Sequence, residues 1–309
     1  MKQSRFHIDF LGKRKMALGF SAVLLIVSLI SLVSRGLELG IDFTGGTLVE
    51  VGYPEAVDLG KVRGLLEAGG LDDATVQHFG TSKDILIRLS SAEGMSSADL
   101  SNRVMDLLNE GDVKGTLRRV EFVGPQVGDE LTEDGGLALL YSLFGILIYV
   151  AWRFEYRFAL GSVAALIHDV ILTLGFFSIF ALEFDLTVLA AILAVVGYSL
   201  NDTIVVYDRI RENFRKMRKG GPEEIMNVSL NQTLSRTLMT SLTTLLVLFS
   251  LAFLGGEIIH NFALALIVGV VVGTYSSIYI ASPIVLALGV SKADLMLPEK
   301  EGQEVDNRP

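Results

Sequence analysis

Hydrophobic positions along this chain gather into six long runs separated by polar segments. A helix needs roughly 20 apolar residues to cross a bilayer, and runs of about this length predict spanning helices. The pattern therefore predicts a polytopic α-helical membrane protein with six transmembrane helices. The runs cover approximately Met16–Val33, Gly136–Trp152, Phe158–Leu182, Leu186–Tyr207, Thr237–Leu254 and Phe262–Leu288.

The first run follows the basic stretch Lys13–Lys15, as the apolar core of a secretory signal would. A cleaved signal usually has a shorter core and an A-x-A-like cleavage site, and neither is evident here. The first run is therefore interpreted as an uncleaved membrane anchor.

The distribution of lysine and arginine predicts the orientation of the six helices. Basic residues in short flanks mark the cytoplasmic side of a membrane protein. The connections "LEFD" and "GGEIIHN" contain neither lysine nor arginine, so we expect both termini in the cytoplasm. The basic flanks are Lys2, Arg5, Lys13, Arg14 and Lys15 at the N-terminus, Arg153 and Arg157 in the second-to-third connection, and Arg209, Arg211, Arg215, Lys216, Arg218 and Lys219 in the fourth-to-fifth.

The polar segment between the first two helices, residues 36–134, is predicted to form an extracytoplasmic domain. Its pattern indicates a strand in "DFTGGTLVEVGY", a helix in "VDLGKVRGLLEAGG", a hairpin with a turn at Gly80–Lys83, a helix capped by Ser96 or Ser97, and a strand with Val120 and Phe122 on one face. This order is the ferredoxin-like α+β arrangement. His78 has no obvious catalytic companions, which favours a folding or docking module over a catalytic one.

The predicted organisation has four parts. Residues 1–35 form the cytoplasmic N-terminus and helix 1, and residues 36–134 the outer domain. Residues 135–290 form helices 2–6 with a cytoplasmic loop at about 208–235, and residues 291–309 a cytoplasmic tail. The segment Arg209–Leu230 is basic and amphipathic, so it could lie on the membrane surface or contact another protein.

The amino-acid composition narrows the range of possible ligands and cofactors. Half of the 309 residues are hydrophobic, and the net charge of −9 gives no field suited to nucleic acid. The chain has no cysteine and only 4 histidines without an HExxH pair, so we expect no metal site. No G-x-x-x-x-G-K-[ST] loop is present, so no nucleotide or other cofactor is expected, and the transmembrane proton gradient remains as an energy source.

An acidic residue lies inside the fourth apolar run, in "VVGYSLNDTIVVYDRIREN". Asp202 precedes Asp208, near the expected membrane boundary, by six residues, which is a depth of roughly 9 Å. An aspartate near the centre of a membrane helix costs on the order of 2.5–3.5 kcal/mol. Ser199 and Tyr198 lie one turn earlier, so Asp202 belongs to a polar stripe that should face other helices or water.

Arg236, at the start of the fifth span, is the predicted partner of Asp202 because consecutive spans are usually adjacent and the two depths could match. Thr240 follows on the same face, with Thr243 or Thr244 one turn further. Two structural alternatives stay open: Arg236 could be a snorkelling residue at a helix end, and Asp202 a static packing residue.

The third and sixth runs also contain polar or small residues. His168 and Asp169 lie near the middle of the third, with Asp169 at a depth of roughly 18 Å counted from Arg157. They could form part of a polar path, or they could only satisfy each other's hydrogen-bonding groups. Gly269, Gly273 and Ser277 recur at four-residue intervals and predict a small-residue face for close helix packing.

Four motifs together resemble the SecF family, the smaller half of the SecD–SecF membrane complex, related to the resistance-nodulation-division (RND) transporters. They are "GIDFTGGT" with Asp42, Gly45 and Gly46, "FVGPQVGDEL" with Gly124, Pro125 and Gly128, "IHDV", and "GYSLNDTIVVYDRIREN". The pair Asn201-Asp202 and the following "DRIREN" favour SecF over SecD.

This resemblance implies an RND-type half with a ferredoxin-like outer domain, acting in the bacterial inner membrane in late, proton-driven steps of Sec-dependent export. It implies SecD as a heterodimer partner, the SecYEG channel with SecA and YajC as further partners, and exported polypeptides as substrates. It places an aspartate of the fourth span and an arginine of the fifth in the proton path, which correspond to Asp202 and Arg236. A further essential carboxylate of that path belongs to SecD.

Three other functions compete with proton-coupled export. A scaffold subunit would need no titrating residue. An intramembrane aspartyl protease would use Asp169 and Asp202, but their expected depths differ by about 9 Å and the G-x-G-D pattern of such enzymes is missing. A drug-efflux pump would need two large outer loops, and this chain has one compact outer segment.

Overall fold

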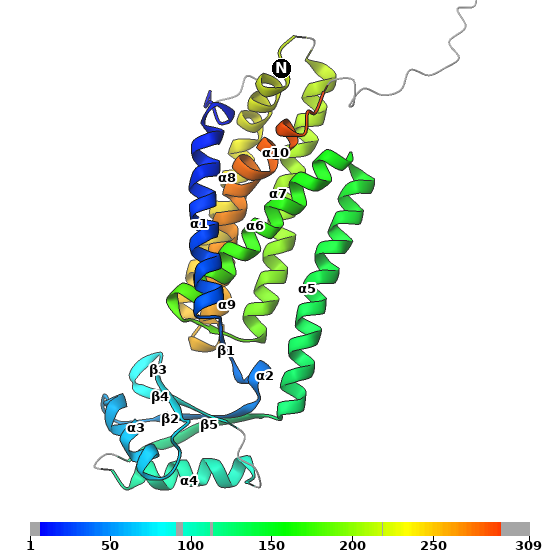
Figure 1. Cartoon of the computed structure of the whole chain (residues 1–309). Helices are drawn as coiled ribbons and strands as arrows, with labels where there is room; N and C mark the ends of the chain where they lie inside the picture. The colour runs from blue at the N-terminus through cyan, green and yellow to red at the C-terminus, as the bar shows by residue number, and fades with distance from the viewer. Residues whose placement is uncertain (1–6, 91–94, 112–113, 218, 292–309) are drawn as a thin grey trace, which may run out of the picture.

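The computed structural model describes residues 7–90, 95–111, 114–217 and 219–291. The predicted tail, residues 291–309, lies outside this part except for Ser291. A bundle of long helices carries an α/β domain at one end (Figure 1). We call this end the domain end. The opposite end, where α1 begins and the connection from α7 to α8 lies, is called the basic end.

The predicted number of spanning helices is confirmed: six helices of the described part are long and apolar enough to cross a membrane. Two short elements accompany these helices. The 3-10 turn η1 (Leu11–Lys13) precedes the first helix, and the π-helical segment η2 (Ser277–Ala281) lies within the last one. The helices are α1 (Arg14–Ser34), α5 (Pro125–Arg153), α6 (Tyr156–Phe180), α7 (Leu186–Lys216), α8 (Pro222–Leu254) and α9 (Glu257–Ser276), which continues through η2 into α10 (Ser282–Ala287).

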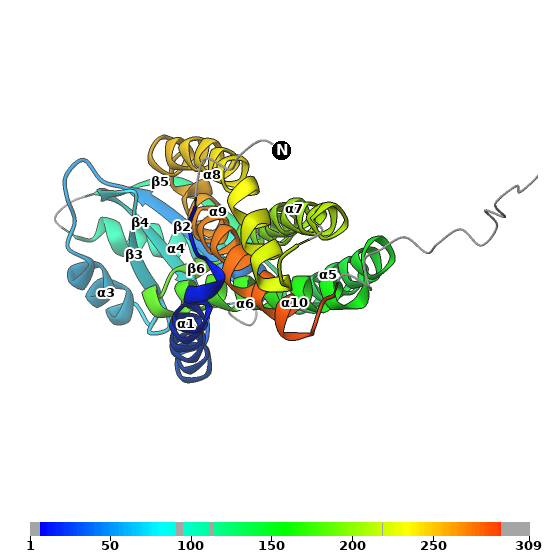
Figure 2. The ribbon, with the colours of Figure 1, turned by 90° about the horizontal axis from the view of Figure 1, so that it is seen from above.

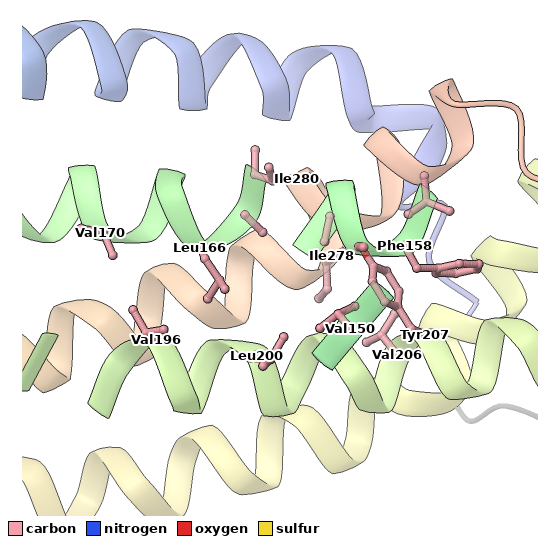
Figure 3. Packing of buried hydrophobic residues seen from close by; sticks show 14 of the residues in the cluster. Val150, Phe158, Leu166, Val170, Val196, Leu200, Val206, Tyr207, Ile278 and Ile280 are labelled. Atoms are coloured by element: carbon pink, nitrogen blue, oxygen red, sulfur yellow. The ribbon is translucent and has the colours of Figure 1, made fainter. Parts of the chain in front are cut away.

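Helices α6, α7 and α9 form the middle of the bundle, with α1 and α5 at its edge (Figure 2). In their apolar stretches, 56%, 50% and 50% of positions are buried, against 17%, 11% and 22% for α1, α5 and α8. Phe158 of α6 and Tyr207 of α7 pack edge to face, with ring centroids 4.8 Å apart (Figure 3). The polar residues that these central helices carry are therefore held inside protein.

The predicted loop at 208–235 is wrong in its extent. Helix α7 continues to Lys216 and α8 begins at Pro222, so the connection between them is short. The two helical extensions bury apolar residues that belong to the core of the bundle, Ile210, Phe214, Ile225 and Met226, each at most 2% exposed. Asn213 also donates to Ser229 Oγ across the pair (2.8 Å). These contacts favour a helical hairpin over a segment lying flat on a membrane.

The domain follows the predicted order of elements. A four-stranded antiparallel sheet has the strand order β3-β4-β2-β5, and α3 and α4 pack on it with a core that includes Val49, Leu66, Ile87 and Val104. The elements are β2 (Gly46–Gly52), α3 (Leu59–Ala68), β3 (Thr75–Phe79), β4 (Thr81–Leu89), α4 (Ser97–Asn109) and β5 (Thr116–Val123).

Three details of the domain differ from expectation. The letters "DFT" belong to a short helix, α2 (Ile41–Thr44), and the strand begins only at Gly46. The hairpin turn is tighter than predicted, because Gly80 alone, at φ +72°, separates β3 from β4. Phe122 is 54% exposed, because β5 is an edge strand and the domain core does not extend over it.

The domain is attached to the bundle at more points than its two chain connections. The short strand β1 (Glu38–Leu39), which follows α1, pairs in parallel with β6 (Glu183–Phe184), in the connection between α6 and α7. This pairing fixes the start of the domain against the N-terminal end of α7.

Candidate functional site

Asp202 lies inside the bundle, 9% exposed, and both carboxylate oxygens accept hydrogen bonds from hydroxyl groups of other helices. Thr237 Oγ1 of α8 donates to Oδ1 (2.7 Å), and Ser277 Oγ of η2 donates to Oδ2 (2.6 Å). Both acceptors are oxygens of the Asp202 carboxyl group. Hydrogen bonds to an ionised carboxylate are stronger than hydrogen bonds between neutral groups. Asp202 therefore joins three helices through its side chain.

Asp169 of α6 is a second buried carboxylate, with no exposed surface. Its Oδ2 accepts from Ser199 Oγ of α7 (2.6 Å) and from Ser276 Oγ of α9 (2.7 Å). Its Oδ1 lies 2.9 Å from Nδ1 of His168, whose Nε2 is buried and has no hydrogen-bond partner among the residues that the structure describes. The polar residues predicted in the third run thus contact α7 and α9 as well as each other.

Glycines of α9 allow these contacts. A Cβ at Gly269 would lie 2.1 Å from a methyl of Val195, and one at Gly273 would lie 3.0 Å from Cβ of Ser199. Small residues at four-residue spacing let two helices approach closely in a membrane. The close approach of α9 to α7 brings Ser276 and Ser277 within reach of the two carboxylates.

The two carboxylates lie nearer in depth than their counted positions suggest. Ser199, which contacts Asp169, precedes Asp202 by three residues, a rise of about 4.5 Å along α7. The difference of about 9 Å counted along the helices stays a prediction, and the contact shows only that the carboxyl groups can lie closer than the helix positions that carry them. Side chains on an α-helix point toward its N-terminus, so Asp169 and Asp202 lean toward each other from the antiparallel α6 and α7.

Arg236, Asn201 and Thr240 do not join this cluster. All three side chains are exposed on the surface of this chain. Within the described part Arg236 makes no ion pair with Asp202, although its charge is near enough to act on that carboxylate electrostatically. Thr240 donates back to the carbonyl of Arg236 (3.0 Å). Adjacent residues of a helix point about 100° apart, so Thr237 faces inward where Arg236 faces outward.

Sequence reasoning missed three residues that contact the carboxylates: Thr237, Ser276 and Ser277, the last of which was assigned to packing alone. A signal was present, because two consecutive serines inside an apolar span would be costly if they faced lipid. A further hydroxyl chain runs beside them, from Tyr198 to Ser241 (3.1 Å) and from Ser241 to Thr274 (2.7 Å).

The glycine-rich motif after α1 contacts the beginnings of two membrane helices. Asp42 Oδ2 accepts from the backbone N–H of Leu186, the first residue of α7 (3.0 Å), and Asp185 Oδ1 accepts from that of Val188 (2.8 Å). The N-terminal N–H groups of a helix have no partner within the helix, and side-chain oxygens that accept from them stabilise it. The helix that carries Asp202 is thus capped in part by the motif.

The same motif packs on the start of α5, where Gly124 is the N-cap and Pro125 the first helical residue. Gly45 adopts a φ of +68°, and a Cβ there would lie 2.9 Å from Cα of Pro125. A Cβ at Gly128 would lie 2.8 Å from the backbone N of Gly45. The glycines of the two motifs therefore make one backbone-to-backbone contact.

An ion pair fastens the sheet to the connection between α6 and α7. The Arg88 guanidinium of β4 contacts the Glu183 carboxylate and donates to the carbonyl of Leu39 (2.8 Å). Gln77 Nε2 donates to the other Glu183 oxygen (3.3 Å). Burial raises the pKa of Glu183 above the usual range of a glutamate, an effect that Arg88 opposes.

We expect mild acid to break this ion pair without weakening the fold. The pair needs an ionised Glu183, so it is lost as the pH falls through the raised pKa. A carboxyl whose pKa is higher in the folded state contributes stability that is present at low pH and is lost as pH rises, so acid does not unfold the protein through Glu183. The same sign applies to any local opening that exposes Glu183, so the protection of the Gly40 amide, which donates to the carbonyl of Phe184, should hold or rise by up to about fivefold in acid, because a partly exposed group of this kind contributes about 1 kcal/mol or less.

Glu183→Gln is the matched control for this expectation. Its amide protection at neutral pH should already equal that of the wild type in acid, with no further change as the pH falls and an unchanged thermal midpoint. Equal acid sensitivity of the wild-type and variant amides would contradict the role given to Glu183.

Comparison with known proteins gives consistent matches over nearly the whole chain. Residues 103–291 match the family described as protein export membrane protein SecD/SecF, C-terminal, and residues 30–53 match the SecD/SecF GG motif. The protein translocase subunit SecF of Vibrio alginolyticus is 54% identical over 305 residues, which cover 98% of this chain and 97% of that relative.

Among solved structures, the translocon-associated membrane protein SecDF from a Thermus species is similar with a TM-score of 0.85 at 38% identity, over 93% of this chain. This chain spans only 39% of the length of that protein. A structure of SecDF in a super-membrane-facing form gives a TM-score of 0.70 over the same share. The arrangement of this chain is therefore more similar to the first structure than to the second.

Proposed function

This chain belongs to the SecF family of protein translocase subunits, which supports a role in protein export, and we propose that it couples the proton gradient to late steps of Sec-dependent translocation. The observation that carries the proposal is Asp202, a carboxylate inside the membrane bundle held by hydroxyls of two other helices. Ionisable residues in membrane interiors are costly to keep and mark functional sites by default.

The proton gradient suits this site as an energy source. One elementary charge that crosses 100 mV is worth about 2.3 kcal/mol. A carboxylate that binds a proton from one side and releases it to the other converts this energy into a change of its hydrogen bonds. Thr237 and Ser277 belong to two different helices, so such a change would act on how α8 and α9 pack against α7.

We propose that SecD covers the exposed polar face of α7 and α8. This face carries Asn201, Arg236, Thr240 and Thr243, all exposed in the chain by itself. Polar side chains in this position would be costly against lipid, so a protein partner is the favoured neighbour. The likeness of this chain to part of SecDF supports SecD as that partner. Such an interface would enclose Arg236 beside Asp202.

We further propose the inner membrane of a bacterium as the location, with the basic end and both termini in the cytoplasm. The basic flanks support this orientation. The domain is then extracytoplasmic, and its strand order β3-β4-β2-β5 with two helices on the sheet supports the ferredoxin-like class. The SecYEG channel with SecA, YajC and exported polypeptides are proposed as further partners.

The protease alternative finds no support in the geometry. An aspartyl dyad needs two carboxylates that act on one substrate, one as base and one as acid. Here Ser276 donates to Asp169 and Ser277 donates to Asp202, and no direct hydrogen bond joins the two acids within the described residues. The alternative of a scaffold subunit without proton coupling is tested by the substitutions of Arg236 and Asp202 described next.

Substitutions of Arg236 test the proposal. In vesicles that contain this chain with SecD, SecYEG and SecA, Arg236→Met should abolish the stimulation of export by the proton gradient, and Arg236→Lys should retain part of it. The reason is that lysine keeps the charge beside Asp202 without the planar guanidinium. The measurement is the export of a model preprotein with and without a protonophore.

Binding of SecD must be unchanged in both Arg236 variants for this result to bear on coupling. If the double variant Asp202→Asn, Arg236→Met supports gradient-stimulated export fully, the chain is a scaffold and the proposed coupling is wrong.

A further inference from the structure

Two consecutive serines lie between the two buried carboxylates. Ser276 is the last residue of α9, and Ser277 is the first of the π-helical segment η2. Both are fully buried, and they donate to different acids, Ser276 to Asp169 (2.7 Å) and Ser277 to Asp202 (2.6 Å). The acids are therefore joined through one peptide unit.

The π-helical segment has its own polar support. Ser282 Oγ donates to the carbonyl of Ser277, five residues earlier (2.9 Å). Ile278 and Ile280 of the same segment pack among buried residues of α6 and α7 (Figure 3). π-Helical turns are rare and often lie at functional sites. The segment begins at the residue that contacts Asp202, so a change at that contact acts on the turn directly.

Each serine hydroxyl has a second acceptor within reach. Ser276 Oγ lies 3.2 Å from the carbonyl of Gly273, and Ser277 Oγ lies 3.1 Å from that of Thr274. A hydroxyl has one proton to donate and can also accept. While the carboxyl is ionised, it is the stronger acceptor and takes the serine proton. Once the carboxyl is protonated, its O–H can donate to the serine oxygen, and the serine proton turns to the carbonyl.

A second connection closes a ring. Ser199, one turn before Asp202 on α7, also donates to Asp169 (2.6 Å). The ring runs from Asp169 through Ser276 and Ser277 to Asp202 and back along α7 through Ser199. The other titratable or charged groups around it are His168 on α6, Tyr198 on α7, Arg236 on α8 and Tyr275 on α9.

We propose that Ser276 and Ser277 are positioning residues that couple Asp169 to Asp202, so that the two acids bind protons as one unit. The inference rests on the proposed proton coupling and adds Asp169 to it as the second proton-binding group. When one acid gains a proton, the hydroxyl beside it reverses, and the shared peptide changes the geometry offered to the other acid. Groups coupled in this way titrate with midpoints that belong to the pair.

The test is a double-mutant cycle on the complex with SecD in lipid vesicles. Isotope-edited infrared spectroscopy follows the protonated carboxyl band of Asp202 as a function of pH. We expect Asp169→Asn to move the Asp202 midpoint by about one pH unit, a tenfold change in proton affinity. In the background Ser276→Ala, Ser277→Ala the same substitution should move it by less than roughly 0.3 unit. Ser276→Thr with Ser277→Thr, which keeps both hydroxyls, should restore the coupling.

Two results would overturn the inference: no shift with Asp169→Asn in the wild-type background, or an equal shift with and without the serine hydroxyls. Ser250→Ala serves as the matched control, because this exposed serine of α8, within the described part of the chain, bonds to its own helix alone, at the carbonyl of Leu246. The inference and the proposed function can fail separately. Coupling without any export defect in Asp202→Asn would overturn proton-driven export alone, and an export defect without coupling would overturn the role of the serines.

Discussion

Asp202→Asn should remove the gradient-dependent part of protein export while leaving the fold and the complex with SecD intact. Asparagine is nearly the same size, and its side-chain oxygen can still accept from Thr237 or Ser277. It cannot bind and release a proton, so it forfeits the coupling worth about 2.3 kcal/mol per charge at 100 mV, a factor of roughly 50 in an equilibrium. We expect the gradient-stimulated rate to fall at least about tenfold.

The measurement is the export of a preprotein into vesicles with an imposed proton gradient, compared with ATP-driven export without one. Glu223→Gln is the control, because Glu223 is an exposed carboxylate paired with Arg14 (2.6 Å) at the basic end and such pairs contribute little. Only the gradient-dependent rate should change in Asp202→Asn. A wild-type response to the gradient in that variant would leave no place for the proposed mechanism.

Gly128→Ala is expected to destabilise the contact between the two glycine motifs. The new Cβ would lie 2.8 Å from Gly45 N and 2.9 Å from the carbonyl oxygen of Phe43, and neither backbone atom can move aside as a flexible side chain does. Overpacking of this kind costs about 1–3 kcal/mol. The midpoint of thermal unfolding in detergent, followed by circular dichroism, should fall by roughly 4–8 °C.

Gly136→Ala is the matched control on the same helix, where a Cβ would have no neighbour within 4 Å. Alanine has the higher helix propensity by up to about 1 kcal/mol, so this variant should be as stable as the wild type or more so. Equal losses in the two variants would show that the contact between Gly45 and Gly128 does not bear on stability.

The sequence predicts well those features that depend only on residues close together along the chain. Six helices follow from the lengths of the apolar runs, and the helix cap at Ser96 follows from residue type near the expected helix start. Asp202 could be chosen because a carboxylate in an apolar run is costly wherever that helix packs. None of these inferences needs knowledge of how two helices are rotated against each other.

The partners of Asp202 could not be predicted, because they depend on that rotation. Arg236 and Thr237 are neighbours in sequence, yet only Thr237 faces the bundle. The contact from Asp42 to the N-terminus of α7 joins residues 144 positions apart, and no spacing rule reaches so far. The length of the α7–α8 hairpin was missed for another reason: its apolar residues are separated by basic ones and resemble a surface segment.

Helix α7 has 31 residues, a length of about 46 Å. Its first turn is held by Asp42 and Asp185, and strand β6, just before it, is paired with β1. A stiff rod anchored at one end turns as a whole, so it cannot rotate about its axis near the middle without twisting its anchor. A movement of the sheet is therefore expected to turn α7 as a whole and to change the angle at which Asp202 meets Thr237 and Ser277.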